Sequence, residues 1–152
     1  MKKVFLDASV FLRFLTGDDL KKQQAAQAFF ECVEKKEVLV YVTDITVCSV
    51  VFVLAHPERY YKRREEIREL LSPLLSLENL KTSNRRVLLR ALDIYATHRI
   101  DFIGALLKAT MEADQADTIY SYDTDFDRFP DIRRKEPEEL LSQGKETEEQ
   151  AA

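Results

Sequence analysis

The apolar residues of this chain fall into short continuous runs separated by longer segments with helical spacing. Three runs are rich in β-branched and aromatic residues, as expected for strands buried in a parallel sheet: Val4 to Leu6, Val38 to Val42 and Thr118 to Tyr122. Shorter strand candidates lie at residues 80–82 and 132–135. Because strands alternate with helices, the pattern predicts an α/β fold with a mostly parallel central sheet.

Polar residues before the apolar stripes predict where several helices begin. Ser9, Asp18, Asn84 and Asp101 are placed as N-caps, because their short side chains can accept a hydrogen bond from a free backbone N–H. The segment 45–54 is harder to assign, since its β-branched residues also suit a strand. Helix is favoured over strand there by a modest margin.

The length of 152 residues and the 45% hydrophobic content predict one domain with a substantial core, spanning residues 1–137. Residues 138–152 lose apolar periodicity and are expected to form a disordered tail or a frayed helix. No apolar run approaches the roughly 18 residues of a membrane span, so we expect a cytoplasmic protein with no membrane partner. Cys32 and Cys48 lack metal-ligand spacing and are interpreted as buried thiols.

The net charge of −4 arises in the C-terminal segment, where six acids from residue 136 onward face one lysine. The remainder holds 22 basic and 21 acidic residues and contains two basic clusters, at residues 59–64 and 85–90. Such clusters can contact phosphates, but they are also typical of solvated helix faces. Charge alone therefore does not identify a nucleic-acid partner.

Acidic residues follow two of the predicted strands. Asp7 ends the first run, and Asp123 and Asp125 follow the run at 118–122. In an open parallel sheet the carboxyl ends of strands form the ligand crevice, so these carboxylates are expected to converge. Carboxylate oxygens suit magnesium or manganese. Capping and turn formation are the structural alternatives for each acid.

The order and spacing of four motifs resemble the PIN domain family, specifically the toxin ribonucleases of the VapC type. The resemblance covers about residues 3–137. It implies a three-layer α/β/α fold and a Mg²⁺- or Mn²⁺-dependent endoribonuclease, the toxin of a type II toxin–antitoxin pair. It further implies an RNA substrate, a cognate antitoxin and a homodimer. The motifs are Val4-Phe5-Leu6-Asp7-Ala8-Ser9, Asp101-Phe102-Ile103-Gly104-Ala105-Leu106-Leu107, Ser121-Tyr122-Asp123-Thr124-Asp125-Phe126 and Arg133 to Pro137.

By this resemblance Asp7, Asp101 and Asp123 are the catalytic metal ligands, Asp125 is a further ligand, and Ser9 supports the first acid. Two positions that carry acids in the family are occupied by Ser49 and Gly104. The chain is then an active nuclease with fewer ligands, a catalytically silent module that binds antitoxin or RNA, or a variant altered to abolish toxicity. An acid is expected to suit the backbone at position 104 better than glycine, because that position lies in the first turn of a helix.

Overall fold

The computed structural model describes residues 3–151, apart from the side chains of residues 145–147. Its first sheet has the order β1-β2-β3, formed by β1 (Val4–Phe5), β2 (Val40–Tyr41) and β3 (Leu80–Lys81). A second sheet pairs β4 (Thr118–Tyr120) with β5 (Arg133–Lys135). Every strand pair within residues 3–151 is parallel, as predicted. The expected single sheet is nevertheless divided into two.

Helices separate the strands along the chain, which confirms the alternating α/β pattern. The predicted caps Asn84 and Asp101 are confirmed, since each side chain accepts a hydrogen bond from the backbone N–H three residues later. The first helix, however, is capped by Asp7 instead of Ser9, and the second by Asp19 instead of Asp18. The helices are α1 (Ala8–Leu15), α2 (Leu20–Glu34), α3 (Asp44–Ala55), α4 (Arg64–Leu75), α5 (Arg85–Thr97), α6 (Phe102–Ala113), the 3-10 helix η1 (Thr124–Arg128) and α7 (Pro137–Ala151).

The ambiguous β-branched segment is helix α3, as predicted by the favoured assignment. Val47, Val50, Val51 and Leu54 of this helix are all buried. Burial of each such side chain contributes roughly 1.5–3 kcal/mol, which outweighs the smaller helix-propensity penalty of a β-branched residue. Packing inside the core therefore decides the conformation of this segment.

The hydrophobic core lies among α2, α3, α4, α5 and the first sheet. Its fully buried members come from every one of these elements, including β2 and β3. Residues with 0% exposure include Val33, Val40, Leu54, Ile67, Leu80 and Leu92.

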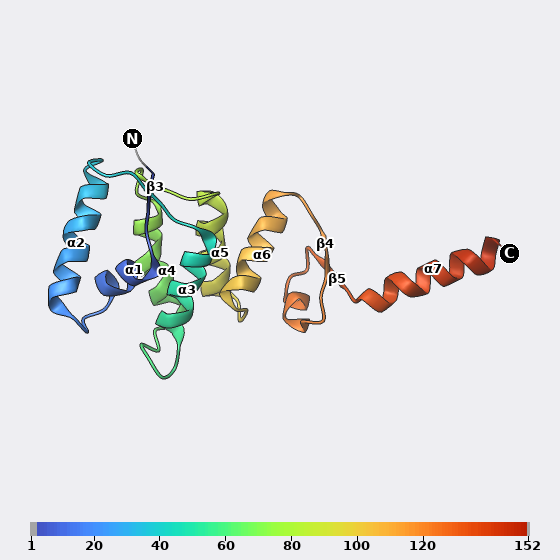
Figure 1. Cartoon of the computed structure of the whole chain (residues 1–152). Helices are drawn as coiled ribbons and strands as arrows, with labels where there is room; N and C mark the ends of the chain where they lie inside the picture. The colour runs from blue at the N-terminus through green and yellow to red at the C-terminus, as the bar shows by residue number, and fades with distance from the viewer. Residues whose placement is uncertain (1–2, 152) are drawn as a thin grey trace.

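The C-terminal part of the chain lies beside this body. In Figure 1, α6 stands between β4–β5 and the sheet that contains β1, and α7 projects away from the rest of the protein. Phe129 anchors the segment, because its ring packs against His98 at 4.9 Å and against the Lys108 ammonium at 5.2 Å. Of the two forms expected after Pro137, residues 137–151 have the helical one.

Candidate functional site

Asp7 lies at the carboxyl end of β1 and also caps α1. Its Oδ2 accepts a hydrogen bond from the Ser9 backbone N–H at 3.1 Å. Hydrogen bonds from the Ser9 side chain and backbone lower the pKa of Asp7 below its ordinary value, because they stabilise the charged form. The carboxylate is exposed, so it is ionised at neutral pH and open to a cation or substrate. In this structure Ser9 therefore holds the Asp7 carboxylate in place.

Asp101 is the N-cap of α6 and is held from two directions. Its Oδ1 accepts from the Gly104 backbone N–H at 2.6 Å. The preceding turn is fixed by Arg64, whose guanidinium donates to the carbonyl oxygens of Tyr95, His98 and Ile100 at 3.0, 3.1 and 2.5 Å. A rigid turn before the cap gives the carboxylate one defined position.

Gly104 is explained by close packing, which corrects the expectation that an acid would suit this position better. A Cβ added there would lie 2.7 Å from Ile100 Cγ1, 2.8 Å from Ile100 Cδ1 and 2.9 Å from Asp101 Oδ1. Ile100 is buried, so its side chain has little room to move away. Any side chain at position 104 therefore displaces Ile100, the capping carboxylate, or both.

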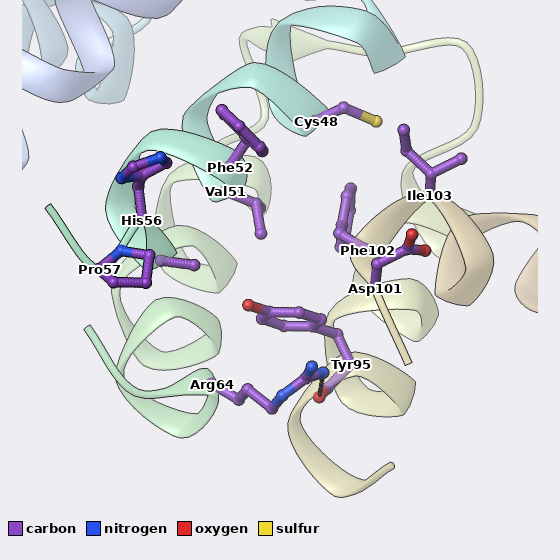
Figure 2. A pocket seen from close by; sticks show the side chains of 11 residues that line it. Cys48, Val51, Phe52, His56, Pro57, Arg64, Tyr95, Asp101, Phe102 and Ile103 are labelled. Atoms are coloured by element: carbon purple, nitrogen blue, oxygen red, sulfur yellow. Dashed lines mark hydrogen bonds between the residues drawn. The ribbon is translucent and has the colours of Figure 1, made fainter. Parts of the chain in front are cut away.

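Ser49 is exposed on α3, whereas its neighbour Cys48 faces the start of α6 (Figure 2). The pKa of the Cys48 thiol is raised, first by burial and then by the nearby carboxylates of Asp44 and Asp101. Both cysteines are half-buried free thiols in the structure, so the burial that was expected for them is partial. At neutral pH the raised pKa keeps Cys48 protonated.

A cavity of about 410 Å³ opens beside Asp101, between α3 and the ends of α5 and α6 (Figure 2). Its walls are mainly apolar, and the charged groups on it are Asp101 and Arg64. Arg64 also lies over the Tyr95 ring, with its Cζ atom 4.3 Å from the ring centroid. Because the Arg64 guanidinium is already bound to three backbone carbonyl groups and packed on the Tyr95 ring, its role in this structure is structural.

The acids after β4 form their own local hydrogen-bond system. Asp123 caps η1, and its Oδ1 accepts from the Asp125 backbone N–H at 2.9 Å. Asp125 pairs with Arg128 at 3.3 Å, and Asp127 pairs with Arg134 at 3.0 Å. Asp127 is exposed.

The predicted ligands are thus distributed over both sides of α6. Asp7 belongs to the first sheet, Asp101 to the start of α6, and Asp123 with Asp125 to the separate β4–β5 unit (Figure 1). Within residues 3–151, apart from the side chains at 145–147, no three His, Cys, Asp or Glu residues are grouped so that they can hold a metal ion. In this conformation a single chain does not form the predicted metal site.

Three charged residues near the site were not identified from the sequence as important. Asp44 follows β2 as Asp7 follows β1, and its Oδ1 accepts from Ser83 Oγ at 3.0 Å. The position after a strand was the available signal for Asp44. Arg64 was placed in a basic cluster. Lys108 is only 2% exposed, and the sequence offered as its signal the i,i+4 spacing to Glu112, whereas its second partner Asp131 is brought to it by folding.

Two known proteins are similar to this chain. A VapC ribonuclease of Aquifex aeolicus is 26% identical over 101 residues, which cover 66% of this chain and 73% of that protein. The crystal structure of VapC20 from Mycobacterium tuberculosis, a sarcin-ricin-loop-cleaving toxin, aligns with 86% of this chain and 98% of that one, at 15% identity and a TM-score of 0.36. The family model of the PIN domain matches residues 4–132, and the chain therefore belongs to the PIN domain family.

Proposed function

We propose that this protein is a ribonuclease, the toxin component of a toxin–antitoxin pair. The observation that carries the proposal is the exposed, ionised Asp7 at the carboxyl end of β1, within a PIN domain that spans residues 4–132. The similarity to a VapC ribonuclease over 66% of the chain supports the reaction class. RNA is the proposed substrate and a cognate antitoxin the proposed partner. A helix long and apolar enough to cross a membrane is absent from residues 3–151, and we propose a cytoplasmic location.

Mg²⁺ or Mn²⁺ is the proposed cofactor, because the candidate ligands are carboxylates, which both ions favour. The residues of one chain do not fit such an ion, since the carboxylates are not gathered in the described conformation. Asp7 and Asp101 each stay fixed by a backbone hydrogen bond, to Ser9 and Gly104 respectively. They are preorganised parts of a site that needs further ligands.

RNA cleavage in Mn²⁺ tests the proposed function. The wild type is compared with Asp7→Asn, and a chelator provides the metal-free control. Asp19→Asn is the matched control, because Asp19 also caps a helix through its side chain but follows no strand. We expect Asp7→Asn to lose at least about tenfold in rate, as removal of one charged group in such a site costs several kcal/mol. Equal rates for wild type and Asp7→Asn would contradict the assignment.

A catalytically silent binding module is the second candidate, favoured by the two positions that lack acids. Gly104 has no space for a side chain, whereas Ser49 is exposed and can be replaced without a core clash. Ser49→Glu is therefore the informative gain-of-function variant. Cleavage by Ser49→Glu but not by the wild type identifies a silenced nuclease, and cleavage by both shows that the remaining acids suffice.

A further inference from the structure

β1 is an edge strand of the first sheet and β4 is an edge strand of the second, and these two open edges lie on opposite sides of the same chain. The Leu6 backbone N–H donates to the Tyr41 carbonyl of β2 at 3.0 Å, so the backbone groups of Phe5 point away from β2. Likewise Ser121 N–H donates to the Lys135 carbonyl of β5 at 2.9 Å, so the backbone groups of Tyr120 point away from β5. Open edges of this kind are templates for pairing with another strand.

Exposed apolar side chains lie along both edges. Phe5 on β1 is 64% exposed, and Tyr120 and Tyr122 beside β4 are 47% and 63% exposed. Strands of parallel sheets are normally covered on both faces, so this exposure is unusual for β1 and β4 alike. Both edges therefore carry the side chains expected of an interface that is not filled within one chain.

The two edges cannot meet in this conformation of one chain. Helix α6 stands between the β4–β5 unit and β1 (Figure 1), and the unit is fixed to α6 by the Lys108–Asp131 ion pair at 2.9 Å and the packing of Phe129. Movement of β4 toward its own β1 would require these buried contacts to break. A second copy presents the same two edges without that requirement.

We propose that two copies of this chain pair reciprocally, with β4 of each copy adding to the open edge of β1 in the other. Each open edge then meets the complementary edge of the partner copy, so the arrangement closes as a symmetric dimer and leaves neither edge free. The result on each side is a five-stranded sheet, in the order β3-β2-β1 of one copy followed by β4-β5 of the other. A parallel β1–β4 pair preserves the direction of both existing sheets.

This pairing completes a site that one chain lacks. Asp7 follows β1 and Asp123 follows β4. When the two strands are parallel neighbours, both aspartates lie at the same carboxyl edge, where the ligand crevice of a parallel sheet forms. Each site then takes Asp7 and Asp101 from one copy and Asp123 from the other. This consequence rests on the proposed nuclease function, whereas the strand pairing itself does not.

Disulfide trapping tests the pairing without any measurement of activity. In a parallel pair, residues whose backbone groups both point to the shared ladder are not directly opposite, so the Phe5 and Tyr120 side chains would lie on different faces of the sheet. When Asp7 and Asp123 are level, Tyr120 lies opposite Val4. Val4→Cys and Tyr120→Cys are therefore introduced into separate chains in which Cys32 and Cys48 are alanine, and the two chains are mixed and oxidised. We expect a crosslinked dimer of the two different chains. Tyr61→Cys, at another exposed ring, is the collision control in place of Tyr120→Cys. A crosslink within one chain carrying both cysteines, or no crosslink above the control, would overturn the proposal.

Sedimentation of Tyr120→Pro gives a second test that needs no cysteines. Proline at 120 removes the N–H that points to the open edge but keeps the Ser121 bond to β5. The wild type is expected to be a dimer at micromolar concentration and Tyr120→Pro a monomer with an unchanged circular-dichroism spectrum. A monomeric wild type, or a folded Tyr120→Pro that dimerises as tightly as the wild type, would contradict reciprocal strand pairing.

Complementation then links the pairing to the active site. Asp7→Asn and Asp123→Asn chains, each inactive alone, are mixed under conditions that allow subunit exchange. In a heterodimer with shared sites one site has both aspartates, so the mixture should recover about one quarter of wild-type cleavage. No recovery, although trapping shows the dimer, would place each site within one copy. If the wild type is also inactive, the proposed function fails while the trapping result stands.

Discussion

Gly104→Ala should destabilise the protein although it replaces a helical glycine with the best helix former. In an unhindered helix this change gains about 1 kcal/mol. Here the new Cβ would lie 2.7 Å from Ile100 Cγ1 and 2.9 Å from Asp101 Oδ1. Overpacking of a buried neighbour costs about 1–3 kcal/mol, and loss of an N-cap hydrogen bond costs about 1 kcal/mol. The expected net loss in the free energy of unfolding is therefore about 1–3 kcal/mol.

Urea denaturation followed by circular dichroism measures this loss. Gly144→Ala is the matched control, because Gly144 lies in α7 and a Cβ there meets nothing within 4 Å. We expect Gly144→Ala to keep the wild-type midpoint or raise it. Gly104→Asp should be at least as unstable as Gly104→Ala, since its charge is placed beside Asp101. A Gly104→Ala protein as stable as the wild type would refute the packing argument.

Two further predictions concern the groups that fix α6 and its preceding turn. Hydrogen bonding to Arg90, and then to Lys108, lowers the pKa of Glu112 to about 2 from 4.5. Because the folded pKa is the lower one, the stabilisation is present above pH 4.5 and is lost as pH falls toward 2. At about 1.4 kcal/mol per pKa unit it is at most about 3 kcal/mol, and about 1–2 kcal/mol after solvent screening. Urea midpoints of Glu112→Gln should thus fall less between pH 5 and pH 3 than those of the wild type; an equal fall would contradict this. Arg64→Lys loses the planar guanidinium that donates to three carbonyl groups, and should reduce the free energy of unfolding by about 1–3 kcal/mol. The control Arg63→Lys changes an exposed ion pair and should alter the free energy of unfolding by less than about 1 kcal/mol. Equal losses for the two variants in urea denaturation would refute the role of Arg64.

The strands and helices were predictable because their signals are local. Apolar runs such as Val38 to Val42 identified β2, and side-chain capping at Asn84 and Asp101 identified the starts of α5 and α6. Cap assignments failed by one or two residues at α1 and α2, where two short polar residues compete for one role. The residue that becomes the N-cap is the one whose side chain reaches a free backbone N–H in the first turn of the helix. The positions of these N–H groups depend on where the helix begins, which the sequence alone does not determine.

The interpretation of Gly104 failed for a different reason. From the sequence, only helix propensity and the helix dipole act on this position, and both favour a carboxylate over glycine. The close approach of Ile100 is set by the conformation of the turn between α5 and α6, which Arg64 holds through the Ile100 carbonyl. The contact is with residues only three and four positions earlier, but it depends on the conformation of the turn before α6, and this conformation overrides both intrinsic preferences.

The division of the strands into two sheets was also not predictable from the sequence. The sequence identifies β1 and β4 as strands and places aspartates after both, but the pairing partner of an edge is not encoded in either run. Pairing within one chain and pairing between two copies bury the same Phe5 and Tyr120 side chains and bring the same Asp7 and Asp123 together. The two arrangements differ in the free energy needed to move the β4–β5 unit around α6. Pairing within one chain requires this movement and therefore breaks the contacts of Lys108 and Phe129, whereas pairing between two copies keeps them. Removing the anchor should consequently favour closure: Phe129→Ala should reduce the yield of the crosslink between copies relative to the one within a chain, whereas an unchanged ratio would show that the anchor does not select the partner.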